Sequence, residues 1–228
     1  MKTILVSLAL LGFTGSTALG VEKAELDGRI ASLTAKLDSM QSNPEKAVPG
    51  EMLQKAQAII LLDRTKGGFI FAYEGGNGVA LARDPKTHDW SPAAFVSASD
   101  ASLGFQIGGQ KSFVVILLMT SDAPRFLTDP KFKFGGEASG TAGDSSTGVG
   151  GSISSSDQPM LVFDDRKGLY GGAAVGGGAI SPNDDANWAY YGQFVTPKEI
   201  LFGNKVKPSA TVSKLIEKLV GYSKSAKK

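Results

Sequence analysis

The sequence contains no cysteine and only one histidine among its 228 residues. Without cysteine there are no disulfide bonds, thiolate zinc sites, cysteine nucleophiles or lipid attachments through an N-terminal cysteine. The single histidine, His88, lies in a stretch with proline and aspartate that is typical of a surface loop. A histidine-based metal site or a Ser-His pair would depend on this residue alone. We therefore expect neither.

The motifs that bind phosphates or activate a serine are also missing. No glycine run continues into the P-loop signature, and none has the spacing of a dinucleotide-binding turn. Gly-x-Ser-x-Gly, the nucleophile elbow, is absent. The acid pairs at 164–165 and 184–185 lack the spacing of a calcium loop. The sequence therefore predicts a protein that is not an enzyme and has no cofactor or metal.

Two further absences limit the partners. The formal net charge is only +2, so the whole chain is not a nucleic-acid-binding polycation. No segment has the run of about 18 apolar residues that a transmembrane helix needs. We expect neither a nucleic-acid partner nor a membrane span.

The N-terminus has the pattern of a secretory signal. A basic start is followed by an apolar run at 4–13, and Ala18 and Gly20 are small residues at the places that signal peptidase prefers. This predicts a signal peptide at 1–20, cleaved after Gly20, and a secreted or periplasmic protein of bacterial type. The alternative is a buried N-terminal strand or helix.

Amphipathic helices are predicted near both ends of the mature chain. Residues 22–41 place one apolar stripe on a helix, formed by Leu26, Ile30, Leu33, Leu37 and Met40. We favour packing of this helix on its own domain, or weak pairing with a partner helix, over a helix lying on a membrane. The second helix spans 209–224, with Val212, Leu215, Ile216, Leu219 and Val220 on one face. Residues 203–228 hold seven lysines and one acid, a formal charge of +6, so this helix either packs on the domain or contacts an anionic membrane.

The region between them contains most of the 29 glycines and reads as strands. Residues 67–83 predict two strands joined by a turn at Asn77-Gly78, and 113–119 predict a central strand that is apolar on both faces. The SPNDDAN stretch at 181–187 reads as a turn, and 197–202 as a short helix capped by Thr196. The predicted fold is α+β: a curved, mainly antiparallel, Gly-rich sheet, open or barrel-like, flanked by helices.

The order of several motifs resembles the SYLF domain family. They include "PGEMLQKAQAIILLD" from Pro49, "WSPAAF" from Trp90, "SLGFQIGGQKSFVVILLM" from Ser102 and "KGLYGGAAVGGGAI" from Lys167. The resemblance covers about residues 49–202, leaving 21–48 as a helix and linker and 203–228 as a basic tail. It implies that the 168–180 stretch is a core strand-turn-strand, with glycines that allow close packing. Trp90 and the glycines of the GFQIGG motif, Gly108 among them, are expected to be structural.

The resemblance also implies a non-catalytic domain that binds acidic phospholipid through basic residues near its start. At that position this sequence has Lys55, Arg64 and Lys66, and the basic tail adds Lys214 and Lys218. Each could equally be an ordinary solvated charge. Fungal members also bind actin, but an exported bacterial protein would not meet it, so we expect no actin partner. The alternative function is a structural or assembly module that associates, also with itself, through its helices.

Overall fold

The computed structural model of the chain describes residues 22–67, 72–102, 110–128, 133–134, 160–165, 168–169 and 178–224. The helices are α1 (Lys23–Gln41), α2 (Gly50–Lys55), α3 (Asp184–Tyr191), α4 (Pro197–Leu201), α5 (Ala210–Lys224) and the 3-10 helix η1 (Ala123–Thr128). The strands are β1 (Ala58–Gly67), β2 (Ala72–Ala82), β3 (Ala94–Ser102), β4 (Gln110–Leu118), β5 (Lys133–Phe134), β6 (Met160–Asp164), β7 (Gly168–Leu169) and β8 (Gly178–Pro182). The predicted signal peptide lies outside the described residues, as does Gly108.

The strands form one antiparallel sheet in the order β5-β8-β3-β2-β1-β4-β6-β7. Each described pairing is antiparallel. Within the described residues β5 and β7 lie at opposite ends and do not pair, so the sheet is open rather than barrel-like. The α+β class and the antiparallel sheet are confirmed.

The centre of the sheet is apolar on both faces. β1 buries Ala58 through Leu62 and β4 buries Phe113 through Leu118. Successive side chains of a strand point to opposite faces, so runs of this kind must be covered on both sides. The predicted central strand at 113–119 is thus confirmed as β4, which lies between β1 and β6.

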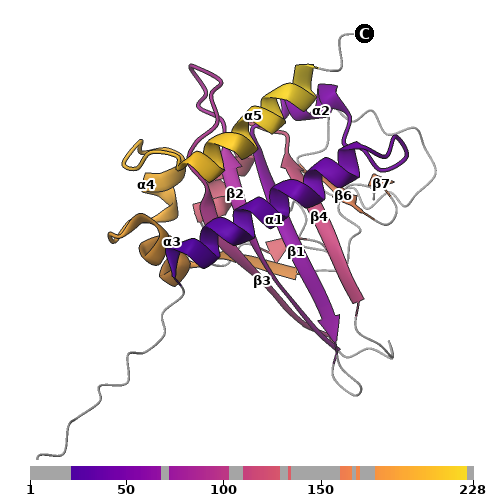
Figure 1. Cartoon of the computed structure of the whole chain (residues 1–228), viewed down its shortest axis with the longest axis horizontal. Coiled ribbons are helices and arrows are strands. Elements are labelled where there is room, and N and C mark those ends of the chain that lie inside the picture. Colours follow the sequence, from indigo (N-terminus) through magenta and orange to yellow (C-terminus); the bar gives the residue numbers. More distant parts are fainter. Residues whose placement is uncertain are drawn as a thin grey trace, which may run out of the picture.

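Helices cover both faces of the sheet and create two hydrophobic cores. α1, α2 and α5 lie across one face, as Figure 1 shows, and they share a core with Ile59 and Leu61 of β1. Ile60 and Leu62, which point the other way, pack with η1 and α4 in the second core. The sheet is therefore the middle of three layers.

α1 is the predicted N-terminal helix, and its apolar stripe faces the sheet. Leu26, Ile30 and Leu37 are fully buried, and Leu33 and Met40 nearly so. Burying a leucine or isoleucine side chain contributes about 1.5–3 kcal/mol, so this stripe stabilises the domain. Packing on its own domain, the favoured interpretation, is therefore what the structure contains. The boundary drawn at residue 49 stays a prediction.

The turn predicted at Asn77-Gly78 is wrong, because both residues lie inside β2. The glycines there serve close approach of two strands. A Cβ on Gly76 would lie 2.4 Å from the carbonyl oxygen of Asp63, and one on Gly78 would lie 2.2 Å from that of Leu61. Real Cβ atoms do not come so close to a carbonyl oxygen. Glycine is therefore favoured at these two positions because the neighbouring strand leaves no room for a side chain, and not because the chain turns there.

Two further predictions differ from the structure. The stretch taken as a turn at 181–187 contains the end of β8, then Asn183, whose side chain accepts from the backbone N–H of Ala186 and so caps α3. In the 168–180 stretch, β7 ends one side of the sheet and β8 lies near the other, so they are not neighbouring strands. Residues 170–177 lie outside the described part of the chain.

Candidate functional site

The three basic residues predicted near the start of the domain do not form one exposed patch. Lys55 ends α2 and is exposed, whereas Arg64 lies well along β1 and is only 4% exposed. At about 3.3 Å per residue, the strand separates Arg64 from its beginning near Lys55 by roughly 20 Å. Lys66 is also on β1, in a part whose side chains are not described. A lipid contact through these residues stays a prediction.

The other two predicted residues, Lys214 and Lys218, lie on α5. Both are exposed, and Lys218 Nζ lies 3.0 Å from Asp38 Oδ2 of α1. The opposite side of α5 belongs to the core: Val212, Leu215 and Leu219 are buried, with Ile216 and Val220 packed beside them. The helix therefore presents charge to solvent and keeps its apolar residues inside.

Polar contacts hold α1 and α5 side by side in parallel. At their N-terminal ends, the Tyr190 hydroxyl of α3 lies 2.7 Å from Asp27 Oδ1 and 2.5 Å from Ser209 Oγ. At their C-terminal ends, the Tyr222 hydroxyl donates to Asp38. Burial and the neighbouring Asp27 raise the pKa of Tyr190, so its hydroxyl stays protonated as a donor.

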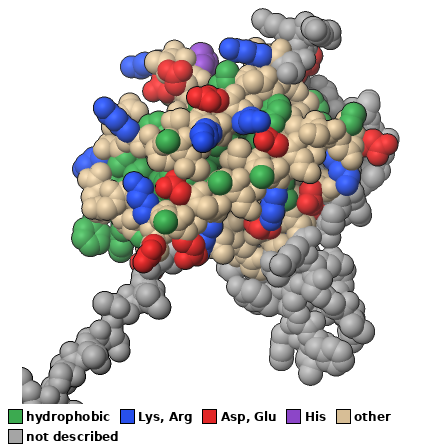
Figure 2. All heavy atoms as spheres, in the orientation of Figure 1, with side chains coloured by type: hydrophobic (Ala, Val, Ile, Leu, Met, Phe, Trp, Pro, Cys, Tyr) green, Lys and Arg blue, Asp and Glu red, His purple; other side chains and the backbone are tan. Residues whose placement is uncertain are grey.

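The charges on the α1–α5 face are mixed in sign. Figure 2 views this face, and lysine and arginine side chains alternate there with aspartate and glutamate. α1 contributes both signs, for example the Arg29–Glu25 pair at 2.6 Å, whereas α5 contributes lysines and one acid, Glu217. The surplus of positive charge therefore comes from α5 and the segment that leads into it.

A cleft of about 420 Å³ lies between α1 and the sheet. Its wall includes the glycines of β2, and its polar groups come from Arg29, Ser32, Asp63, Asn77 and Asn183. The two charged residues of the lining both have partners outside it, because Arg29 pairs with Glu25 and Asp63 pairs with Lys36. With one cation and one acid in its lining, the cleft carries no net charge that would select an anion.

Metal-binding side chains do not gather in the part of the chain that the structure describes. Within the described residues, no cluster of histidine or acidic residues could hold a metal ion. His88 is exposed in the loop before Trp90, as predicted, with a φ of 62°. Within the same residues no helix is long and apolar enough to cross a membrane.

Trp90, one of the recognised motif residues, has a structural environment. Its side chain is 7% exposed, and the Arg83 guanidinium stacks 4.1 Å from the ring centroid. Arg83 also donates to the backbone oxygens of Ala56 at 2.9 Å and Leu53 at 3.0 Å. The pair thereby ties the loop after β2 to the end of α2.

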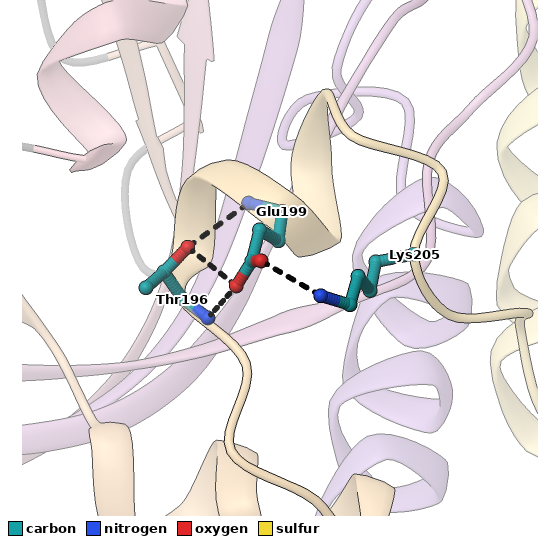
Figure 3. Close-up of polar contacts among 3 residues, drawn as sticks. All are labelled: Thr196, Glu199 and Lys205. Carbon is teal, nitrogen blue, oxygen red and sulfur yellow. Dashed lines mark hydrogen bonds and ion pairs between the residues drawn. The ribbon is translucent and has the colours of Figure 1, made fainter.

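The helix α4 is fixed by a capping box that Figure 3 shows. The Thr196 side chain accepts from the backbone N–H of Glu199, whose carboxylate accepts from the backbone N–H of Thr196. Lys205 Nζ lies 3.1 Å from the same carboxylate. The Thr196 backbone N–H, then Lys205, lower the pKa of Glu199 to about 2. The predicted cap is confirmed.

The sequence analysis missed three exposed aromatic residues around α3 and α4. Trp188 is 37% exposed, Phe194 81% and Phe202 41%. Their clustering within fifteen residues was visible in the sequence, next to Lys198 and Lys205. The sequence did not show which side of each short helix is buried.

Comparison with known proteins gives related sequences but no related structure. The model of the Ysc84 family, described as "Las17-binding protein actin regulator", matches residues 99–222. The SH3 domain-containing YSC84-like protein 1 of Xenopus laevis is 29% identical over 174 residues, which is 75% of this chain and 52% of that protein. No solved structure matches.

Two yeast relatives have the same pattern. LAS seventeen-binding protein 3 of Saccharomyces cerevisiae is 28% identical over 77% of this chain and 39% of its own length. The SH3 domain-containing protein PJ696.02 of Schizosaccharomyces pombe is 29% identical over 78% of this chain and 42% of its own.

The chain thus spans about half the length of these relatives or less. The family description names a binding protein and an actin regulator, so the expectation that actin is not a partner is not supported. Because the family model matches more than half of the chain, the protein belongs to the Ysc84 family, the SYLF family that its motifs resemble.

Proposed function

We propose that this protein is an exported, non-catalytic domain that binds acidic phospholipid at a membrane surface. The observation that carries the proposal is the arrangement of α5, which exposes its lysines while its apolar residues stay in the core. Such a helix binds by attraction to anionic headgroups and need not leave the domain. The lipid-binding role that the family resemblance implies supports the same interpretation.

The expected strength follows from the number of lysines near the bilayer. Each contributes about 1 kcal/mol beside an anionic surface, and the attraction fades over a Debye length of about 8–10 Å. Lys214 has no ion pair among the described residues, whereas Lys218 is partly neutralised by Asp38. Binding is therefore expected to be reversible and sensitive to salt.

Export rests on the sequence at 1–20, and it gives the proposal its compartment. N-terminal sequencing of the protein recovered from the periplasm or medium is expected to begin at Val21. Retention of the segment, or a start more than a few residues away, would contradict the signal-peptide assignment. Lipid binding would be unaffected by that result.

Vesicle co-sedimentation tests the lipid-binding function. The protein is expected to sediment with vesicles that contain phosphatidylglycerol and to stay in solution with phosphatidylcholine alone. Lys214→Gln is expected to weaken binding at low salt about fivefold, whereas Lys86→Gln in an exposed loop serves as the matched control. If the unaltered protein does not sediment with anionic vesicles at low salt, the proposed function is wrong.

A second candidate function is binding to a protein partner, favoured by the family description and by the name of the Saccharomyces relative. In this chain the apolar stripes of α1 and α5 are buried, so a partner would meet their polar outer faces. Co-sedimentation with actin filaments separates the candidates. Sedimentation with filaments, together with none on anionic vesicles, would favour the protein partner.

A further inference from the structure

We propose that the aromatic pair of Trp188 and Phe194, together with the exposed Phe202 at the end of α4, inserts into the interface of an anionic lipid bilayer. These three residues are called the aromatic patch below. This inference rests on the proposed phospholipid binding and adds the surface that enters the membrane. Electrostatic attraction through lysines brings a protein close to a bilayer, and inserted aromatic rings hold it there. The patch supplies the apolar component that α5 keeps buried.

The patch stands out from the described surface. Its members are the large hydrophobic residues exposed there, with Phe194 at 81%. The rings of Trp188 and Phe194 meet edge to face, with centroids 4.8 Å apart. Single exposed apolar residues are ordinary, but adjoining aromatic rings form a patch that water solvates poorly. In Figure 2 apolar side chains gather at the left edge of the molecule, where α3 and α4 lie in Figure 1.

The surrounding structure leaves these rings outside because other residues fill the core. α3 buries Ala186, Asn187 and Tyr190. The Asn187 side chain also bonds the backbone of Phe95 in β3, at 2.8 and 3.2 Å, so the helix cannot rotate to hide Trp188 without breaking buried hydrogen bonds. The exposure of Trp188 is therefore fixed by the fold.

The connection between α3 and α4 is also held in place. α3 ends at Gly192 in the left-handed conformation, with a φ of 65°, and α4 begins at the Thr196 capping box. Phe194 lies between these two fixed points. Val195 next to it is buried in the second core. A ring presented on such a loop loses little conformational freedom on insertion, which favours binding.

The charges near the patch favour an anionic lipid surface as the occupant. Lys198, Lys205 and Lys207 are exposed and lie close to Phe202 in the chain, and the intervening acid, Glu199, is already engaged by its own cap and by Lys205. Lys207 leads directly into α5, so the patch continues into the basic segment. Lysines around apolar tips match the headgroup and acyl layers of a bilayer.

Two acids oppose this attraction. Asp184 and Asp185 are exposed in the first turn of α3, one turn from Trp188. Their carboxylates would approach the same headgroups and weaken the binding. Removing these acids should therefore strengthen binding to anionic vesicles, whereas removing lysines should weaken it.

Tryptophan fluorescence provides a direct test, because the chain has only two tryptophans and Trp90 is buried beneath Arg83. With phosphatidylglycerol vesicles, the emission of the unaltered protein is expected to shift to the blue and to be quenched by brominated acyl chains. Trp188→Phe keeps an aromatic ring and leaves Trp90, so both responses are expected to disappear. Responses that persist in this variant would overturn the inference.

Binding measurements give the second readout. Phe194→Ser changes a ring that is already 81% exposed, so the fold is expected to be retained. Binding to anionic vesicles is expected to weaken about tenfold, slightly less than the loss of a fully buried phenylalanine ring would give. Gln193→Ser at the next exposed position is the matched control and is expected to bind unchanged. Asp184→Asn combined with Asp185→Asn is expected to bind several-fold more tightly at low salt.

The outcomes separate the two proposals. If the unaltered protein sediments with anionic vesicles but Phe194→Ser binds equally well, the patch is not the insertion surface and phospholipid binding stands. If the unaltered protein does not sediment at all, both are wrong. A blue shift that grows with protein concentration in the absence of vesicles would identify the patch as a contact between copies of the chain and overturn the inference.

Discussion

α1 and α5 lie side by side on the same face of the sheet, yet they differ in the charge they show to solvent. Each buries one apolar stripe in the same core, and two tyrosines tie their ends together. α1 carries three acids and three bases, whereas the 15 residues of α5 contain three lysines and one glutamate. The buried apolar stripes of both helices stabilise the fold, whereas only the exposed lysines of α5 give a charge that can attract an anionic ligand.

The lesson is that an amphipathic basic helix at the end of a chain is not by itself a detachable membrane anchor. The hydrophobic pattern of α5 is accounted for by packing, so only its lysines remain to interact with a membrane. An apolar anchor must then come from elsewhere. The exposed aromatic rings around α3 and α4 are the described residues of that kind.

The largest expected effect tests whether α5 belongs to the core as fully as α1 does. Leu37→Ala in α1 and Leu215→Ala in α5 each remove a fully buried side chain, so each is expected to lower the free energy of unfolding by about 2–5 kcal/mol. Denaturant titration measures both. If α5 were detachable, Leu215→Ala would hardly change the free energy of unfolding. That result would contradict the view that α5 belongs to the core as α1 does.

Much of this arrangement was predictable because the signals were local. The stripes of α1 and α5 repeat over many turns, and the Thr196 cap needs only three neighbouring residues. α3 was missed because two turns give too little periodicity, and its buried Asn187 looks like a turn residue until its bonds to Phe95 are seen. Of the two ends of the 168–180 stretch, β7 pairs with β6 just before it in the chain, whereas β8 pairs with β3, which lies far earlier.

The candidate site was predictable only in part, for a physical reason. Lysine content identifies the basic segment, but it does not reveal that Arg64 is buried or that Lys218 meets Asp38. The exposure of Phe194 depends on what the rest of α3 and α4 bury, which is a property of tertiary packing. Sequence therefore indicates the kind of ligand better than the surface that contacts it.

A second prediction contrasts the glycines of helix and sheet. Gly78→Ala in β2 puts a Cβ against the Leu61 carbonyl, so the strands must separate, and the loss is expected to be about 1–3 kcal/mol. Gly28→Ala in α1 meets nothing within 4 Å. It is expected to stabilise the protein by about 0.5–1 kcal/mol, because glycine is a poor helix former. Thermal unfolding of the two variants should move in opposite directions.

A third prediction separates stability from binding among the lysines of α5. Lys218→Gln loses the ion pair with Asp38, so stability is expected to fall by about 0.2–1 kcal/mol at low salt. Lys214→Gln is expected to leave stability unchanged and to weaken vesicle binding more than Lys218→Gln does. Equal effects of both variants on unfolding would show that the Asp38 contact contributes nothing in solution.

The smallest expected effect concerns Asp27, which joins α1 to α3 and α5. Burial alone would raise the pKa of this carboxyl, but hydrogen bonds from Tyr190, Thr211 and Ser209, with nearby Lys23, outweigh burial and leave the pKa below its ordinary 3.8. A lowered pKa in the folded state stabilises the protein above pH 3.8, and this contribution is lost as pH falls below that value. Because Asp27 is largely solvated, Asp27→Asn is expected to cost only a few tenths of a kcal/mol at pH 7.

The difference in unfolding free energy between the Asp27→Asn variant and the unaltered protein is therefore expected to shrink as the solution is made more acidic than pH 3.8. Tyr190→Phe removes the main hydrogen-bond donor and is expected to reduce the same acid dependence while keeping the ring in the core. A variant difference that stays constant from pH 7 down to pH 2 would mean that the charge of Asp27 does not help to hold the two helices together.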